Sequence, residues 1–294
     1  MGESSDDALF GRVMQLLVDT EAVAAVAVEL ARDIEGTNVP EPIASHVGRV
    51  VRQAAPMLVA TSVEQKRAVL GAIRAAFRVA NDLMEKPETP PGWTYDDPAT
   101  LNAQGRTSGA FGPLMAAVLN ELGPPVDGHR RVLDVGAGVG WLSIALARAI
   151  PGAEIVGIDI WPPSIACARQ NIAAEGLASS VRIVEQDVVA LGDDIRFDAA
   201  WLPGPFLPRS VAEKALARLR AALRPRGLVM LGIFAGPPDP LANAVLDLRT
   251  VRSGGHPYQG AEAIALVEAA GFQRVHEVER TWKSPLRLVV GVNP

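Results

Sequence analysis

The feature that most constrains the fold is a regular alternation of short β-branched segments with helical segments between residues 131 and 294. Parallel strands need a crossover between them, usually a helix, so this alternation predicts a mostly parallel sheet covered by helices on both faces. The predicted strands are Arg131–Val135, Glu154–Ile158, Val181–Glu185, Asp198–Leu202, Leu228–Phe234, Val275–Glu279 and Leu286–Gly291. The predicted helices are Trp141–Ile150, Ser164–Glu175, Val211–Leu223, Leu241–Val251 and Ala261–Ala270.

The end of this region departs from the alternation, because only a short connection separates the last two predicted strands. Such a connection is too short for a parallel crossover and predicts an antiparallel pair. The sequence therefore predicts an α/β unit with a seven-stranded, mostly parallel sheet whose last strand is antiparallel.

The amino-terminal part has a different texture, with apolar residues at helical spacing and no strand pattern. We expect helices from about Asp7 to Leu30, over Glu41–Ala60 and over Ser62–Leu83, and a short connecting helix over Phe111–Leu122. Lys86–Gly92 holds three prolines and a glycine in seven residues and is typical of a linker. We therefore expect an all-helical domain over residues 1–88, acting as a lid or in homodimerisation, and a second domain over residues 89–294.

Composition excludes several classes of protein. With 28 Lys and Arg against 33 Asp and Glu, the net charge of −5 argues against a nucleic-acid partner, whose phosphates require a basic surface. The single cysteine, Cys167, excludes an internal disulfide and any multi-cysteine metal site. The apolar run Ala22–Val28 is too short to span a membrane, and the acidic start of the chain is unlike a signal peptide. We expect a cytoplasmic protein without a membrane partner.

The first predicted strand runs directly into a glycine turn, Gly136–Gly140, and a helix follows at once. A glycine turn of this kind lets the backbone approach a ligand and directs free N–H groups at it. Asp159 ends the second strand, where a carboxylate is placed to accept both hydroxyls of a ribose. The glycine pattern is Gly-x-Gly-x-Gly, and Trp141 stands where a dinucleotide fingerprint requires its last glycine. The nucleotide is therefore not expected to be NAD, and the chain also has no Tyr-x-x-x-Lys pair.

The third strand ends in Glu185–Val188, which places the carboxylate of Asp187 where an adenine amino group would lie. With this addition the region from about Arg130 to Pro294 resembles the class I S-adenosylmethionine-dependent methyltransferases. The loop Arg249–Tyr258, together with Trp201–Pro208, resembles bacterial methyltransferases of specialised-metabolite and modified-peptide pathways. The resemblance implies a Rossmann-like fold, a methyl-transfer activity and S-adenosylmethionine as cofactor.

The resemblance also implies roles for individual residues around this cofactor. It places Asp134, Gly136, Ala137 and Gly138 around the methionine part, Asp159 on the ribose, and Ile160, Asp187 and Val188 around the adenine. Gln104 and Leu202 are further candidates for cofactor contact, since the segment before the first strand often closes over the cofactor in such enzymes. The alternative interpretation of the two glycines is a tight turn without a ligand.

The methyl acceptor is expected at the end of the fourth strand, in Trp201–Pro208. Nitrogen-directed relatives often carry Asn or Asp before two prolines here, whereas this chain has Leu202. We therefore expect methylation of oxygen in a small molecule or peptide, beside an apolar wall to which Trp93, Tyr95 and Trp201 add aromatic area.

Three side chains are candidates for the chemistry. His256 is the candidate base for a hydroxyl acceptor, and Arg106 or Arg252 would orient a carboxylate, which needs no base. The alternative interpretation of each residue is structural: Arg106 would anchor its loop, and His256 would cap a helix. No metal-ligand cluster is evident in the sequence. Methylation of nitrogen or carbon, and a non-catalytic protein that binds the cofactor beside a partner enzyme, remain alternatives.

Overall fold

The computed structural model describes residues 5–124, 128–192, 196–282 and 284–294. The chain divides into two compact units, Met1–Glu88 and Thr89–Pro294. Of the helices described, none combines the length and the apolar content needed to cross a lipid bilayer.

The amino-terminal unit is helical throughout its described residues. It contains α1 (Ser5–Glu35), α2 (Glu41–Ala54), the 3-10 turn η1 (Pro56–Ala60) and α3 (Val63–Glu85). Its small core is formed by Val26, Leu30, Ala31, Val47, Val51 and Leu70. The helical segment predicted over Glu41–Ala60 is divided at Pro56, which has no N–H to continue α2 and begins a separate 3-10 turn.

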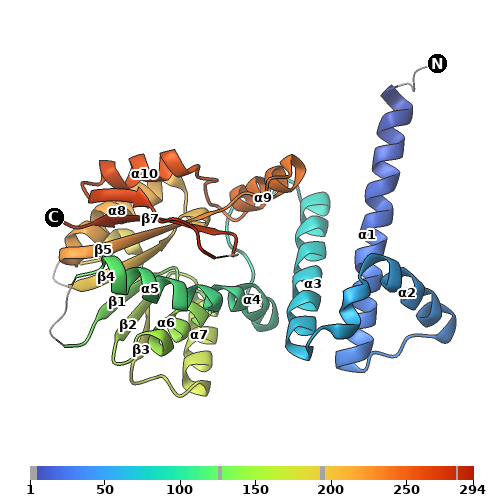
Figure 1. The fold of residues 1–294 in the computed structure, drawn as a ribbon, viewed down its shortest axis with the longest axis horizontal. Helices are drawn as coiled ribbons and strands as arrows, with labels where there is room; N and C mark the ends of the chain where they lie inside the picture. The colour runs from blue at the N-terminus through green and yellow to red at the C-terminus, as the bar shows by residue number, and fades with distance from the viewer. Residues whose placement is uncertain (1–4, 125–127, 193–195, 283) are drawn as a thin grey trace. The chain divides into compact units, whose positions relative to one another are not determined.

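The carboxy-terminal unit has the predicted α/β architecture. Its strands are β1 (Arg131–Val135), β2 (Glu154–Asp159), β3 (Val181–Glu185), β4 (Phe197–Pro203), β5 (Leu223–Phe234), β6 (Gln273–Glu277) and β7 (Leu286–Val292). They form one seven-stranded sheet in the order β3-β2-β1-β4-β5-β7-β6 (Figure 1). Strand β7 runs opposite to the other six strands, because it returns through a short connection to lie between β5 and β6. The prediction of a mostly parallel sheet with an antiparallel last strand is confirmed.

The helices of this unit are α4 (Pro98–Gly105), α5 (Gly112–Leu122), α6 (Trp141–Ala149), α7 (Pro162–Ala174), α8 (Arg209–Ala222), α9 (Pro240–Arg252) and α10 (Gly260–Ala269). Three 3-10 turns accompany them: η2 (Arg106–Phe111), η3 (Val188–Ala190) and η4 (Gly204–Phe206). Helix α4 and turn η2 were not predicted.

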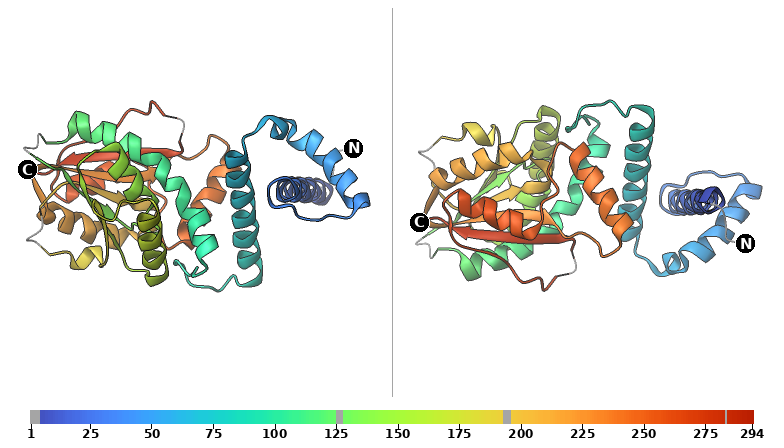
Figure 2. Two further views of the ribbon diagram at one scale, coloured as in Figure 1. Left: turned by 90° about the horizontal axis from the view of Figure 1, so that it is seen from below. Right: turned by 90° about the horizontal axis from the view of Figure 1, so that it is seen from above.

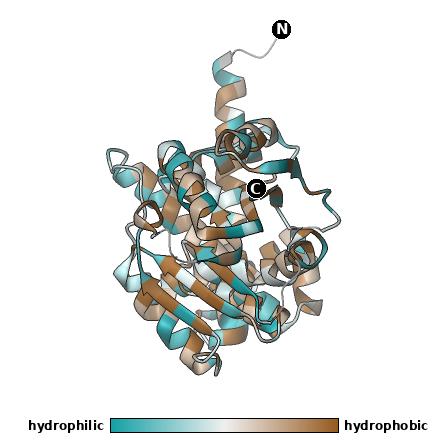
Figure 3. Ribbon diagram, turned by 90° about the vertical axis from the view of Figure 1, so that its left-hand side faces the viewer, coloured by the Kyte–Doolittle hydropathy of each residue, from teal (hydrophilic) through white to brown (hydrophobic). Residues whose placement is uncertain are grey.

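Two separate cores fill the two faces of the sheet, since alternate residues of a strand point to opposite sides. One core joins the strands to α5, α6 and α7, and the other joins them to α8 and α10. Figure 2 shows helices on both sides of the sheet, and Figure 3 shows strands coloured mainly as hydrophobic. Burial on both faces is what parallel strands require, and it leaves their carboxyl ends as the accessible edge.

Close packing of α5 on α6 depends on Gly112. A Cβ atom added there would lie 2.5 Å from Ala145 Cβ and 2.8 Å from the Ala145 carbonyl carbon. We expect Gly112→Ala to lower the free energy of unfolding of this unit by about 1–3 kcal/mol, because the backbones must separate. Chemical denaturation followed by tryptophan fluorescence measures this unit alone, because all five tryptophans of the chain lie within residues 89–294.

Gly192→Ala serves as the matched control, since a Cβ at Gly192 would meet nothing within 4 Å. It should change the free energy of unfolding by less than about 0.5 kcal/mol. Equal effects of the two substitutions would contradict the packing explanation.

Candidate active site

The glycine turn after β1 forms the floor of the site. Gly136, Gly138 and Gly140 have φ angles of 64°, 55° and 84°, which side-chain-bearing residues rarely adopt. Ala137 between them is buried, and its N–H donates to the Ile158 carbonyl oxygen at 3.0 Å. The turn is therefore fixed to the end of β2.

Asp159 at the end of β2 holds the same turn from the other side. Its Oδ2 accepts a hydrogen bond from Gly138 N–H and its Oδ1 accepts one from Trp161 N–H, each at 2.8 Å. Burial raises the pKa of Asp159, although the backbone N–H groups of Trp161, Gly138 and Ile160 lower it in part. A carboxylate offers about four acceptor positions, so capacity remains for a pair of hydroxyl donors.

Asp134 lies beneath the turn and is only 1% exposed. Its Oδ2 accepts a hydrogen bond from the Ser143 hydroxyl at 2.6 Å, whereas its Oδ1 has no partner among the described residues. Burial raises the pKa of Asp134 to about 7; the Ser143 hydrogen bond opposes this rise and the charge of Asp159 adds to it. A buried carboxyl oxygen without a donor is a place where a ligand's ammonium group would bind.

The residues predicted for the adenine follow β2 and β3. Ile160 is 67% exposed, which is unusual for an isoleucine next to a buried strand. Asp187 is exposed, and its Oδ1 accepts from Val189 N–H at 2.9 Å, which starts η3. Val188 is buried in the core, so its backbone rather than its side chain is available to a ligand.

The segment before β1 is attached to the glycine turn. Gly105 at the end of α4 packs so closely on Val139 that an added Cβ would lie 2.3 Å from a Val139 methyl. The Arg106 guanidinium lies 4.7 Å from the centre of the Trp141 ring, and the indole N–H of Trp141 donates to Asn102 Oδ1 at 3.3 Å. The Trp141 indole thus anchors α4 and η2. Gln104 is in α4, and its side chain lies outside the described residues.

A second attachment joins the start of this segment to the end of β2. The indole N–H of Trp161 donates to the Tyr95 carbonyl oxygen at 2.7 Å, and the Tyr95 ring meets Trp93 edge to face at 5.8 Å. The segment before β1 is therefore attached to the loops that follow β1 and β2.

The end of β4 differs in part from the sequence expectation. Leu202 is completely buried in the core beneath α8 and α10, so only its backbone is available to a cofactor. The expectation that Trp201 lines an acceptor pocket is wrong, because its ring lies over Gly232 of β5 within the opposite core. A Cβ at Gly232 would lie 1.9 Å from the Trp201 ring.

An apolar surface nevertheless exists at this edge. Pro203 packs against Gly136, whose added Cβ would lie 3.2 Å from the proline ring. Phe206 is 49% exposed and meets Phe234, the last residue of β5, edge to face at 6.0 Å. The rings of Phe206 and Phe234 thus lie just past the carboxyl ends of two neighbouring strands, and Pro203 connects this surface to the glycine turn.

His256 lies in the loop between α9 and α10, which packs on η4. The close contact requires Gly255, because an added Cβ there would lie 1.7 Å from the Pro205 carbonyl oxygen. His256 Nε2 lies 2.9 Å from Glu262 Oε1 in the first turn of α10, and the same oxygen accepts from Arg209. The imidazole is one-third exposed, and its Nδ1 has no hydrogen-bond partner among the described residues.

Tyr258 packs beneath this group. Its ring meets that of His256 at 4.6 Å, and its hydroxyl is buried without a hydrogen-bond partner in the described part of the chain. Burial and the charges of Glu262 and Glu213 raise the pKa of Tyr258 to about 12, although Arg209 lowers it in part. The Tyr258 hydroxyl therefore remains protonated at neutral pH and cannot act as a base there. His256, with the Glu262 carboxylate beside it, is the group that can accept a proton.

Sequence analysis missed Glu262, Arg209 and Phe234. No spacing signal identifies them, because the fold brings α8, α10 and β5 together from distant parts of the chain. Arg252 ends α9, and its carbonyl oxygen accepts from Gly92 N–H at 2.9 Å.

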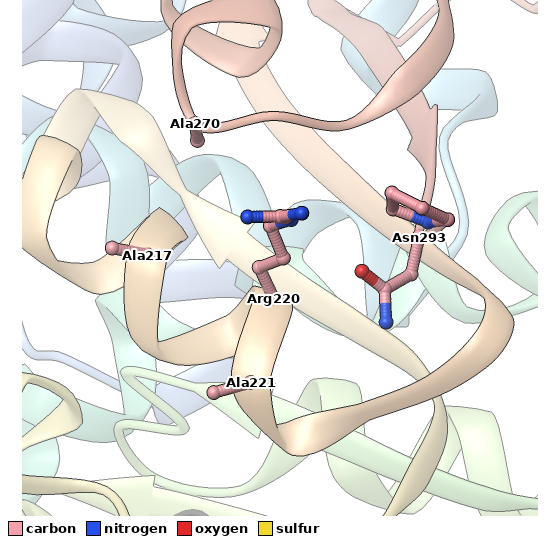
Figure 4. Close-up of a pocket in the computed structure, with 6 residues that line it drawn as sticks. Ala217, Arg220, Ala221, Ala270 and Asn293 are labelled. Carbon is pink, nitrogen blue, oxygen red and sulfur yellow. The ribbon is translucent and has the colours of Figure 1, made fainter.

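Two further observations delimit the site. Among the described residues no group of three or more His, Cys, Asp or Glu side chains is placed to hold a metal ion. A pocket of about 350 Å³ lined by Ala217, Arg220, Ala221, Ala270, Asn293 and Pro294 is shown in Figure 4. It lies where β5 begins, since Asn293 donates to the Leu223 carbonyl oxygen, and so at the edge of the sheet opposite the glycine turn.

Comparison with known proteins agrees with this geometry. Residues 132–227 match the family described as a methyltransferase domain. The demethylmenaquinone methyltransferase of Thermus thermophilus is 40% identical over 110 residues, which cover 37% of this chain and 49% of that protein. The release factor glutamine methyltransferase of Deinococcus radiodurans is 40% identical over 87 residues, covering 30% of each chain. The matched regions span about half or less of these two relatives' lengths.

Solved structures resemble nearly the whole chain at low sequence identity. Mitomycin 7-O-methyltransferase matches with a TM-score of 0.69 and 19% identity, covering 99% of this chain and all of that one. An O-methyltransferase family protein from Burkholderia thailandensis gives 0.68 and 16%, covering 100% and 99%. Human N-acetylserotonin methyltransferase in complex with S-adenosylmethionine gives 0.66 and 13%, covering 100% and 99%. Residues 132–227 are thus similar to a methyltransferase domain, and the carboxy-terminal unit has the class I methyltransferase fold.

The raised pKa of Asp134 predicts a pH effect on stability. Asp134 binds its proton more tightly in the folded protein than in the unfolded chain, where its pKa is near 3.8. Its contribution to stability is therefore present at low pH and is lost as the pH rises from about 4 to about 7. Relative to Asp134→Asn, which does not titrate, the wild-type protein should lose on the order of a few kcal/mol over this range.

Thermal unfolding of both proteins between about pH 4.5 and pH 8 measures the difference. Both Ser143 and Asp159 face Asp134 and are present in each protein, so the comparison isolates the Asp134 carboxyl. Parallel curves over the whole range would show that this carboxyl does not titrate there.

Proposed function

We propose that this protein is an S-adenosylmethionine-dependent methyltransferase that methylates an oxygen atom of a small molecule or peptide. The observation that carries the proposal is the combination of a left-handed glycine turn, a buried oxygen of Asp134 that no described residue partners, and Asp159 with remaining acceptor capacity. These features lie together at the carboxyl edge of β1 and β2, where ligands bind in open α/β sheets.

The donor groups match the chemistry of this cofactor. Asp134 Oδ1 would accept from its amino group, Asp159 from its two ribose hydroxyls, and Ile160 would pack against its adenine. Gly136, Ala137 and Gly138 would leave room for the methionine part, with Asp187 and Val188 beside the adenine. When bound, S-adenosylmethionine supplies a methyl group on a positively charged sulfur, which is already a good leaving group. The protein then contributes alignment and exclusion of water.

An oxygen acceptor fits the surroundings of β4. The position before its terminal proline holds a buried leucine, Leu202, which cannot form a hydrogen bond with a target nitrogen. Phe206 and Phe234 offer an apolar surface suited to a mid-sized organic acceptor.

His256 is the proposed base for a hydroxyl acceptor. Glu262 accepts from its Nε2–H, and this hydrogen bond fixes the tautomer in which Nδ1 carries the free lone pair. A proton taken from the acceptor at Nδ1 would leave an imidazolium that the Glu262 carboxylate stabilises, although Arg209 shares that carboxylate. For a carboxylate acceptor no base is needed, and Arg106 or Arg252 would orient it.

The amino-terminal unit is proposed to act outside the chemistry. Among its described residues no group of three or more His, Cys, Asp or Glu side chains is placed to hold a metal ion. A role in covering the acceptor or in joining two subunits is consistent with its helical build.

S-adenosylhomocysteine should bind and raise the melting temperature, because a ligand selective for the folded protein stabilises it. Asp159→Asn should weaken binding at least tenfold, or roughly 1.4 kcal/mol, since the amide cannot accept from both hydroxyls and has no charge. Thermal unfolding measures the melting temperature and isothermal titration calorimetry measures the affinity, with Glu268→Gln on the exposed face of α10 as the control of unchanged affinity. Binding of NAD in place of S-adenosylhomocysteine would overturn the proposal.

His256→Ala distinguishes the two oxygen acceptors once a substrate has been identified. With a hydroxyl acceptor it should lower kcat by about 10²-fold or more at unchanged cofactor affinity, and Glu262→Gln should lower kcat less. With a carboxylate acceptor it should have little effect, while Arg106→Ala or Arg252→Ala should raise the acceptor's KM. A methyl group found on nitrogen or carbon of the product would contradict the assignment to oxygen. Cofactor binding without turnover on any acceptor would instead favour a non-catalytic binding protein.

A further inference from the structure

The pocket in Figure 4 lies between the carboxyl ends of α8 and α10 and the end of β7. Its volume of about 350 Å³ is at the lower end of the range of small-molecule sites. Four of its six lining residues are alanine or proline, whose small side chains leave the space open. Polar groups enter it from Arg220 and Asn293. We therefore ask which ligand these two side chains would bind.

Asn293 presents a fixed hydrogen-bond acceptor to the pocket. The residue is 8% exposed, and its Nδ2 donates to the carbonyl oxygens of Leu223 and Arg224 at 3.0 and 3.1 Å. These two hydrogen bonds use both amide hydrogens and so determine which way the carboxamide is turned. Its Oδ1 points away from them toward Arg220 (Figure 4) and accepts from no residue that the structure describes. A ligand in this pocket must therefore offer a hydrogen-bond donor to Asn293.

Arg220 contributes the one charged side chain among the lining residues. Its guanidinium lies against the backbone of Gly271, where an added Cβ would lie 3.1 Å from Cζ and 3.2 Å from Nε. Gly271 has a φ angle of 87°, which also favours glycine at this position and so keeps the space for the guanidinium. Arg220 has no carboxylate partner within the described part of the chain. Its donors are therefore available to an acidic group.

Two further arginines add positive charge around the end of β7. Arg226 and Arg274, with φ angles of 65° and 51°, are the residues other than glycine that have positive φ angles in the described ranges. Arg226 N–H donates to the Asn293 carbonyl oxygen at 2.9 Å, and Gln273, next to Arg274, pairs with Val292. Neither arginine has a carboxylate partner among the described residues. Although the whole chain has a net charge of −5, this region therefore attracts anions.

We infer that this pocket binds a small carboxylic acid that carries a hydroxyl or amino group next to its carboxylate. The carboxylate would accept hydrogen bonds from the Arg220 guanidinium, and the hydroxyl or amino group would donate to Asn293 Oδ1. One lining guanidinium neutralises one negative charge, so a monocarboxylate fits better than a phosphate monoester. The second charge of a phosphate monoester would face the Asn293 oxygen without compensation.

The pocket is separate from the candidate active site. It adjoins the first residues of β5, whereas Phe234 at the other end of the same strand belongs to the apolar surface near the glycine turn. The acid is therefore neither the cofactor nor the methyl acceptor, and the inference does not depend on the proposed function.

An NMR titration of the full-length protein with mandelate tests this inference. Phenylacetate, which lacks only the hydroxyl group, should bind more weakly than mandelate by roughly threefold or more, because Asn293 Oδ1 is then left without a donor. Arg220→Gln should weaken mandelate binding by roughly tenfold or more, because the carboxylate loses its charged partner. Lys214→Gln is the matched control, since it removes the same charge from an exposed position of α8 that does not line the pocket.

A second variant tests the space itself. Ala217→Phe should fill part of the pocket and weaken mandelate binding while Arg220 stays in place. No binding of mandelate at millimolar concentration, equal affinity for phenylacetate, or equal losses in Arg220→Gln and Lys214→Gln would each overturn the inference. Melting temperatures show whether each variant is folded. Affinity for S-adenosylhomocysteine should be unchanged in all of them, so failure here is distinguishable from failure of the proposed function.

Discussion

The carboxylate of Asp159 joins the two loops on which the candidate site depends. One oxygen binds the backbone of Gly138 in the turn after β1, and the other binds the backbone of Trp161 at the start of α7. Trp161 in turn binds the backbone of Tyr95, so a single side chain at the end of β2 connects the turn, the next helix and the covering segment. Asp159 is buried without a salt bridge to any residue that the structure describes, and this is tolerable because backbone N–H groups compensate its charge.

Much of the carboxy-terminal fold could be predicted because its local signals agree with one another. The β-branched residues of β1 predict a strand, and the helical spacing that begins at Trp141 predicts α6. The glycines between them predict the turn, and the structure shows that they have positive φ angles. Helix α4 escaped prediction because its eight residues carry little amphipathic pattern, and its position is determined by Asn102 and Gly105 packing on distant residues.

The site was predictable only where its residues belong to one continuous motif. Asp134, Gly136 and Asp159 are close in sequence, and the order of strand, turn and strand indicates their positions. Glu262 and Arg209 meet beside His256 only because α8 and α10 lie on the same face of the sheet. Trp201 shows the opposite error, since an aromatic residue at the end of a strand indicated a pocket, whereas the absent side chain of Gly232 creates space for it in the core.

The strand order reverses between β1 and β4, and this reversal divides the edge of the sheet into two regions. Glycine turn, Asp159 and Asp187 lie on the β1-β2-β3 side, whereas Phe206, Phe234 and His256 come from β4, β5 and the loop before α10. Few side chains are shared between these regions, apart from the contact of Pro203 with Gly136. The shape of the surface around Phe206 and Phe234 can therefore change by substitution while the hydrogen bonds that hold the glycine turn to Asp159 stay as they are.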